Sequence, residues 1–204
     1  VLQVDGDKEK DVTPPGFGRI AAQTATQVIG QKIHEAEKEI VIGEFQKKTG
    51  SLIAGIVLRS DPYKMVVSIG KTEGICPKDE QIKGESIQLG SRKWFLLKSI
   101  YRDEEDGRSE IVLSRRDPEF IKQLFVREVP EVGNKSVVIE KIARSAGERT
   151  KVAVSSSQTG VDPVGSCIGQ KGSRIQAILN ELPSSEKVDV IPFSKNINQF
   201  IIQA

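Results

Sequence analysis

The residues best suited to binding chemistry lie between Ile168 and Arg174, where two glycines stand three positions apart around a basic centre. Glycine lets the backbone turn sharply and come close to a ligand without a Cβ in the way. A helix that follows such a loop offers free backbone N–H groups to phosphate oxygens. Lys171 and Arg174 add positive charge at the same place. The segment therefore predicts a turn that binds the phosphate backbone of a nucleic acid.

The residues after this loop distinguish it from an ordinary turn, which is the alternative interpretation of two closely spaced glycines. Ile175, Ile178, Leu179 and Leu182 recur at helical spacing and predict one buried stripe. Arg174 falls off that stripe, so it is free to face solvent or a bound strand. The loop is thus expected to join two amphipathic segments that pack on one core.

Composition limits the classes of protein to consider. The net charge of the 204-residue chain is only +2, which excludes a histone-like polycation and leaves nucleic-acid affinity to local charge. No apolar run approaches the roughly 20 residues of a membrane span, and the first residues do not resemble a signal peptide. A cytoplasmic protein without membrane association is expected. Cys76 and Cys167 have no metal-type spacing and are expected to be reduced structural thiols.

An enzyme has little support in the sequence. His34 is the single histidine and falls in a predicted helix, so neither a Ser-His-Asp triad nor a histidine-rich metal site is expected. The acidic run from Asp103 to Asp106 is interpreted as a hairpin tip and not as a metal site. The sequence thus predicts no catalytic residues, no metal and no cofactor.

The first part of the chain is predicted to be a strand followed by a long helix. Residues 1–12 suggest a single strand, and Thr13-Pro14-Pro15 is a helix-start sequence. Apolar residues then recur every three or four positions, which predicts one amphipathic helix over residues 17–42. We interpret it as a connector, with a coiled coil as the alternative. Residues 1–40 hold 5 Lys/Arg against 7 Asp/Glu, so this part is the least suited to bind RNA.

Two modules are predicted after the connector. Five short strands separated by turn residues predict a small closed barrel of the OB type over residues 43–116. The order helix, strand, strand, helix, glycine loop, helix, strand then predicts an α+β layer over residues 117–192. Residues 193–204 look like the start of a further module, and the chain is expected to be part of a longer protein. The strands expected for the barrel are 51–58, 64–69, 74–76, 94–101 and 109–114.

Four segments give the chain a resemblance to the bacterial NusA family. They are FGRIAAQTATQVI (17–29), LSRRDPEFIKQLFVREVPEV (113–132), IARSAGERTKVAVSS (142–156) and VDPVGSCIGQKGSRIQAILNELPSSEKVDVI (161–191). The resemblance implies a multidomain α+β protein with the end of an N-terminal domain and a connecting helix (1–42), an S-one-type barrel (43–116), a type II KH module (117–192) and the start of a second KH module (193–204).

The resemblance also implies a transcription elongation factor that modulates pausing, termination and antitermination. Its implied partners are nascent single-stranded RNA, RNA polymerase and other elongation or antitermination factors, with the chain itself a monomer. The alternative is a protein-interaction scaffold without direct RNA contact. The RNA-binding residues carried over are Ile168, Gly169, Gln170, Lys171, Gly172, Ser173 and Arg174, with Arg149 and Lys151 as backbone contacts. The barrel lacks stacking aromatics in its second and third strands, and its candidate contacts are Arg59, Tyr63, Lys64, Arg92 and Lys93.

Overall fold

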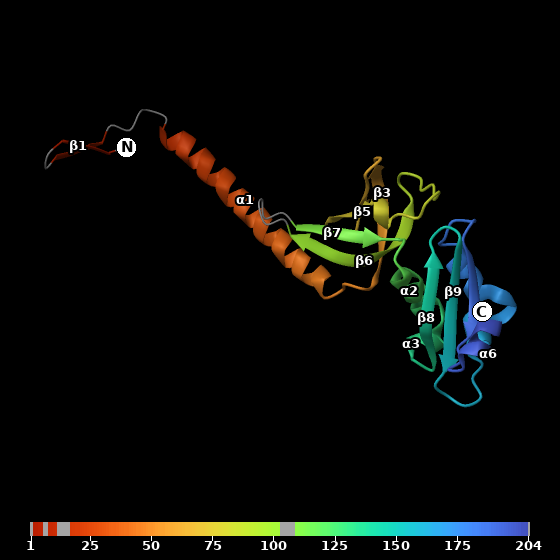
Figure 1. Cartoon of the computed structure of the whole chain (residues 1–204). Coiled ribbons are helices and arrows are strands. Elements are labelled where there is room, and N and C mark those ends of the chain that lie inside the picture. Colours follow the sequence, from red (N-terminus) through yellow and green to blue (C-terminus); the bar gives the residue numbers. More distant parts are fainter. Residues whose placement is uncertain (1, 6–7, 12–16, 103–108, 204) are drawn as a thin grey trace. The chain divides into compact units, whose positions relative to one another are not determined.

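The computed structural model describes residues 2–5, 8–11, 17–102 and 109–203. These fall into two units, Val1–Glu44 and Phe45–Ala204. The interpretations of Thr13-Pro14-Pro15 and of the acidic run 103–106 lie outside the described residues. The first unit contains β1 (Leu2–Asp5), β2 (Lys8–Asp11) and most of α1 (Phe17–Gln46), which are labelled or coloured in Figure 1.

The start of the chain forms two strands, so the prediction of one strand over residues 1–12 was wrong. Strands β1 and β2 pair antiparallel, with Leu2 opposite Asp11 and Asp5 opposite Lys8. Pairing gives the backbone N–H and C=O groups partners that a single strand would lack. Helix α1 has 30 residues and ends at Gln46. Across the described part of the chain, no helix is both long and apolar enough to cross a membrane.

Five strands of the second unit close into a barrel, as predicted. They follow the order β3-β4-β5-β7-β6, and the barrel interior is filled by apolar side chains such as Val57, Phe95, Leu97 and Leu113, all fully buried. The fully buried Cys76 is a free thiol among them. The strands are β3 (Leu52–Ser60), β4 (Lys64–Ser68), β5 (Glu73–Pro77), β6 (Arg92–Arg102) and β7 (Ser109–Ser114), with a short helix η1 (Lys78–Glu80) after β5.

The rest of the second unit is the predicted α+β module of the KH type. Its sheet has the order β10-β9-β8, with β10 parallel and β8 antiparallel to the central β9. This order makes β10 an edge strand. The elements are α2 (Pro118–Glu128), α3 (Pro130–Gly133), β8 (Val137–Ser145), β9 (Arg149–Ser156), α4 (Pro163–Ile168), η2 (Gln170–Gly172), α5 (Ser173–Leu179) and β10 (Lys187–Pro192), followed by α6 (Ile197–Gln203).

Helix α2 supplies the centre of this module's core. It starts where Asp117 accepts a hydrogen bond from the backbone N–H of Glu119, with Pro118 in the first turn. Its four apolar side chains from Phe120 to Phe125 are fully buried and pack with Val152 and Val154 of β9 and Ile178 of α5. Ile82 and Leu96 of the barrel belong to the same core. The barrel and the KH module therefore share one hydrophobic core.

Two buried arginines connect the barrel to the KH module at this core. Arg115 is 1% exposed, and its guanidinium contacts both carboxylate oxygens of Glu85 at 2.6 and 2.9 Å. It also donates to the carbonyl of Trp94 in the barrel and to that of Glu181 after α5. Its guanidinium lies over the ring of Phe120, 5.1 Å from the centroid. One side chain thus satisfies acceptors from both modules.

The second arginine, Arg144, forms a fully buried pair with Glu186. Its Nε donates to Glu186 Oε1 at 2.8 Å, and its Nη1 donates to the carbonyls of Arg115 and Asp117. Glu186 also accepts hydrogen bonds from the Thr150 hydroxyl and the Gly147 N–H. The desolvation cost of a buried ion pair is offset only when its remaining donors and acceptors are also hydrogen-bonded. These hydrogen bonds meet that requirement.

We expect Glu186→Gln to destabilise the second unit by about 3–5 kcal/mol, because it leaves the buried Arg144 charge without a counter-charge. Urea denaturation followed by circular dichroism measures the change. Glu140→Gln is the matched control, since Glu140 is an exposed residue of β8 that bonds to Ser155. Equal stability of the two variants would contradict this role of the buried pair.

The same pair predicts a stability that depends on pH. Burial raises the pKa of Glu186, but hydrogen bonds from Arg144, Thr150 and Gly147 outweigh burial and hold it below its ordinary value of 4.5. The contribution is therefore complete above about pH 4.5 and is lost as pH falls through the lower pKa of the folded state. We expect the free energy of unfolding of the wild type to fall more steeply on acidification below that pH than that of Glu186→Gln. Urea denaturation at a series of pH values measures both free energies. The same dependence on pH in the two proteins would argue against this role of Glu186.

Candidate nucleic-acid interface

The glycine loop between α4 and α5 has a backbone that most residues cannot adopt. Gly169 has φ 76° and ψ 173°, a region used almost only by glycine. Gly172 has φ 77° and ψ 14°, the left-handed helical region. Between them Lys171 is left-handed as well, with φ 51°. This conformation projects Gln170 and Lys171 into solvent, where both are exposed.

Arg174 has a different environment from the one predicted. Its Nη1 lies 2.8 Å from a carboxylate oxygen of Glu131 in α3 and donates to the carbonyl of Ser166 in α4. A Cβ added to Gly169 would lie only 2.7 Å from Arg174 Cγ. Arg174 is half-buried, with its guanidinium engaged inside the module, so its contacts hold the loop in shape. They do not leave it fully free to face solvent.

An open cleft of about 470 Å³ lies beside the loop. Its apolar lining comes from Ile168 at the end of α4, Ile175 of α5 and the edge strand β10. Ile168 is 38% exposed, so part of its side chain is available to a ligand in the cleft. An apolar cleft next to a loop that can contact phosphates is the arrangement that a single nucleic-acid strand needs, because its bases require a surface away from water. The β10 residues that line the cleft are Val188, Asp189, Val190 and Ile191.

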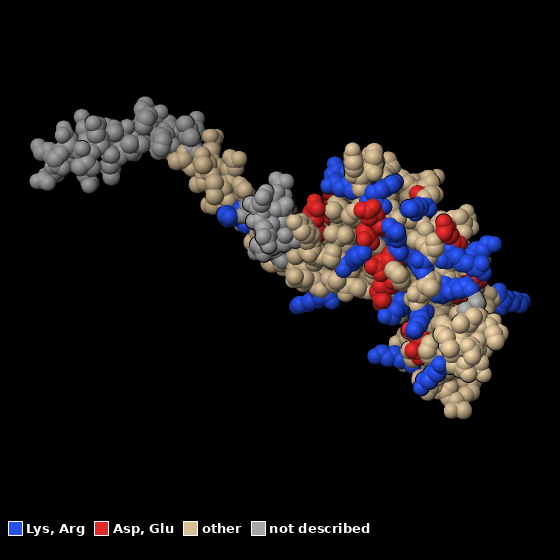
Figure 2. All heavy atoms as spheres, viewed as in Figure 1, with Lys and Arg blue, Asp and Glu red and all other residues tan. Residues whose placement is uncertain are grey.

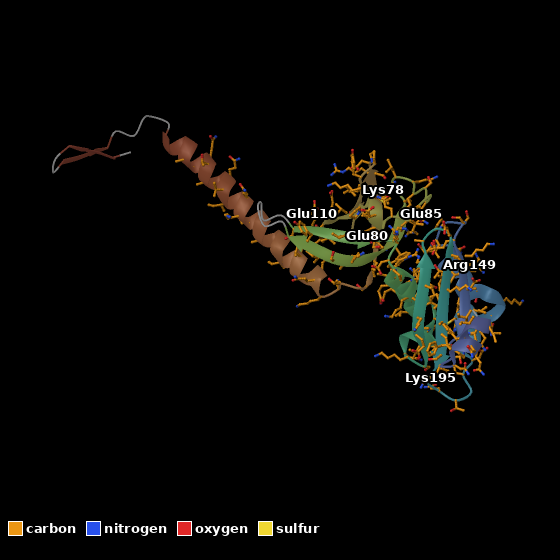
Figure 3. All side chains as sticks on the ribbon, in the orientation of Figure 1. Lys78, Glu80, Glu85, Glu110, Arg149 and Lys195 are labelled. Atoms are coloured by element: carbon orange, nitrogen blue, oxygen red, sulfur yellow. The ribbon has the colours of Figure 1, made fainter. Side chains whose placement is uncertain are left out.

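Arg149 and Lys151, predicted as backbone contacts, have different places. Arg149, which is labelled in Figure 3, lines the cleft and is 60% exposed. Its Nε lies 2.6 Å from Asp189 Oδ2. Hydrogen bonding to Asp189 raises the pKa of Arg149 further. Lys151 is half-buried in the central strand and stands opposite Asp189 in the β9–β10 register. The structure thus brings Arg149 together with Ile168 at one cleft, while Lys151 is not among the cleft residues.

Sequence reasoning missed the contribution of β10. The alternation of Val188 and Val190 with Asp189 predicts a strand, but it does not reveal that this strand is at the edge of the sheet. Arg149 and Asp189 are 40 residues apart in the chain, and only the parallel pairing of β9 with β10 brings them close. The alternation of valine and aspartate was the only sequence signal that pointed to this strand.

The barrel candidates do not gather at the KH cleft. Arg59, Tyr63 and Lys64 lie around the β3–β4 turn, where Asp61 accepts from the N–H groups of Lys64 and Tyr63. Those two N–H groups hold the pKa of Asp61 below its ordinary value. Tyr63 is 82% exposed, so its ring is available for stacking. Arg92 and Lys93 pair instead with the middle of β3.

A second cleft, of about 570 Å³, lies where the barrel meets the KH module. Three of its four cations are engaged: Lys98 contacts Glu80 and Asp117, Arg144 contacts Glu186, and Arg116 donates to the carbonyl of Asp79. The fourth, Lys83, is exposed, but the carboxylates of Asp79, Glu80 and Glu148 line the same cleft. Figure 2 shows blue and red side chains interspersed over this part of the molecule. The junction cleft is therefore a less suitable phosphate site than the glycine loop. Among the described residues, no group of His, Cys, Asp or Glu is arranged to hold a metal ion.

Comparison with known proteins gives two family matches. Residues 115–193 match the NusA-like first KH domain, and residues 2–39 match the NusA N-terminal domain. Proteins named transcription termination/antitermination protein NusA are similar over nearly the whole chain. The relative from Halalkalibacterium halodurans is 39% identical over 202 residues, which are 99% of this chain and 52% of the relative. The relative from Bacillus subtilis is 40% identical over 96% of this chain and 52% of its own length.

The relative from Mycobacterium bovis is 39% identical over 96% of this chain and 58% of its own length. The chain thus spans about half the length of the curated relatives it matches. A solved multidomain protein with nucleic acid binding domains from Streptococcus pneumoniae covers 70% of this chain and 47% of its own, at 14% identity and a TM-score of 0.29.

The two loop glycines should differ in their tolerance of a side chain. We expect Gly172→Ala to destabilise the KH module by about 1–2 kcal/mol, the cost of a left-handed residue, since its Cβ would meet nothing closer than 3.8 Å. Gly169→Ala should cost more, because Gly169 occupies a region that is less accessible to alanine than the left-handed helical region. Its Cβ would also collide with Arg174 and disturb the contacts of Arg174 with Glu131 and Ser166. Urea denaturation of both variants measures the difference. Equal losses of unfolding free energy in the two variants would show that Arg174 does not stabilise the loop.

Proposed function

This chain belongs to the NusA family, and we propose that its KH module binds the nascent single-stranded transcript during transcription elongation. The observation that carries this proposal is the glycine loop with exposed Gln170 and Lys171, directly beside the open apolar cleft. The loop would contact the phosphate backbone, and the cleft would receive the bases. By these contacts the protein would modulate pausing, termination and antitermination.

The chemistry favours a single RNA strand over a duplex. A KH loop grips the backbone of roughly four nucleotides and leaves their bases unstacked for contact. The lining of Ile168, Ile175, Val188 and Val190 is aliphatic, so bases would be held by apolar contact and not by ring stacking. The net charge of +2 gives little general attraction for nucleic acid. Binding would therefore depend on this site.

The barrel is a second candidate RNA surface. Arg59, Lys64, Arg92 and Lys93 would contact phosphates, and Tyr63 would stack with one base. With a single aromatic among these five residues, the barrel would add less affinity than the KH module.

The resemblance also supports protein partners for this chain. RNA polymerase and other elongation or antitermination factors are the partners we propose, with the region matching the NusA N-terminal domain as the polymerase contact. We propose that the chain acts as a monomer in the cytoplasm. The alternative function is a scaffold that contacts proteins without direct RNA binding. The exposed apolar side chains Ile29, Ile33 and Ile40 of α1 favour it for the first unit.

We expect Lys171→Asp, alone or with Gln170→Asp, to reduce binding of short single-stranded RNA at least tenfold while the fold is kept. Both residues are exposed, and the new carboxylates would repel phosphate. Fluorescence anisotropy with single-stranded RNA, matched DNA and a duplex measures the affinity. If the site neutralises about three phosphates, the logarithm of the binding constant should fall against the logarithm of salt concentration with a slope near −2.

Lys47→Asp provides the matched control. Lys47 is an exposed lysine in the turn before β3, so its substitution gives the same change of charge away from the glycine loop. It should leave RNA affinity nearly unchanged. Unaltered binding by Lys171→Asp, or a slope near zero, would favour the scaffold.

A further inference from the structure

The KH cleft contains one charged pair in an otherwise apolar lining. Arg149 and Asp189 lie 2.6 Å apart, and their side chains are 60% and 36% exposed. Ion pairs this exposed contribute little to stability, typically about 0–1 kcal/mol. Stability of the fold therefore does not account for an acid and a base at this position.

The pair lies on the opposite face of the strand from Val188 and Val190 but lines the same cleft. Val188 and Val190 pack with the hydrophobic core beneath the helices, and side chains alternate along a strand. Asp189 therefore projects from the opposite face of β10, together with Arg149 from the neighbouring β9. A base resting on the aliphatic lining would meet these two side chains at the rim of the cleft.

Both side chains retain hydrogen-bonding capacity for a ligand. Among the described residues, the one side-chain hydrogen bond that either residue makes joins Arg149 Nε to Asp189 Oδ2. A guanidinium has five N–H donors and no acceptor, and an ionised carboxylate only accepts, through two oxygens. The Nη groups of Arg149 and Oδ1 of Asp189 therefore offer donors beside an acceptor.

We propose that the Arg149–Asp189 pair selects a nucleobase with an exocyclic amino group and rejects uracil, an inference that rests on the proposed RNA binding by this module. The amino group of cytosine or adenine would donate to Asp189, and the adjacent ring nitrogen would accept from Arg149. Guanine also offers an amino donor. Uracil presents a carbonyl oxygen where cytosine has its amino group, so an oxygen lone pair would face the Asp189 carboxylate.

The test compares hexameric oligocytidine with hexameric oligouridine, which differ at this polar edge and need no knowledge of which nucleotide occupies the cleft. Anisotropy titrations use the wild type, Asp189→Asn and Glu140→Gln. The wild type should bind oligocytidine about tenfold more tightly, the lower end of the discrimination expected from a base-specific contact. Asparagine can donate as well as accept, so Asp189→Asn should bring the ratio to within about twofold. Glu140→Gln, which also removes one exposed carboxylate of this module, should leave the ratio at its wild-type value.

Each outcome separates this inference from the proposed function. Equal wild-type affinities, or a ratio unchanged by Asp189→Asn, would overturn the inference even if Lys171→Asp abolishes binding of both oligomers. Failure of the wild type to bind either oligomer would overturn both the inference and RNA binding by the module. Circular dichroism should show that Asp189→Asn keeps its fold, as expected for an exposed pair.

Discussion

The need to pair buried charges governs how the second unit is built. Arg115 and Arg144 have almost no exposure, and an unpaired charge at either position would cost several kcal/mol. Their donors reach Glu85, Glu186 and carbonyl groups on both sides of the barrel–KH junction. These directional bonds and the shared apolar core act together. They set the positions of the start of α2 and of the segment that leads into β10 relative to the end of the barrel.

The glycine loop depends on a second, smaller set of contacts. Arg174 links α5 to Glu131 of α3 and to the last turn of α4, and its side chain occupies the space that the missing Cβ of Gly169 leaves free. A loop with several left-handed residues is conformationally costly on its own. The internal contacts of Arg174 offset part of that cost, and they leave Gln170 and Lys171 as the exposed side chains of the loop.

The proposed RNA binding divides phosphate contact and base selection between two parts of the module. In the proposed function, exposed Lys171 attracts phosphate, whereas the aliphatic cleft and the Arg149–Asp189 pair contact a base. The net charge is only +2, and charges of both signs are interspersed on the face seen in Figure 2, so long-range attraction is weak and discrimination would come from short-range contacts.

The sequence by itself determined the elements whose signals are local. Alternating apolar residues and turn residues located all five barrel strands to within two residues at either end, and the helix, strand and glycine-loop order gave the KH module. Only the tertiary structure decided that Arg174 contacts Glu131 and Ser166, that β10 is an edge strand and that Arg149 meets Asp189. The same holds for the pairing of Arg144 with Glu186, 42 residues away. Periodicity reports which face of an element is buried, but pairing between elements depends on sheet order and burial, which no local pattern contains.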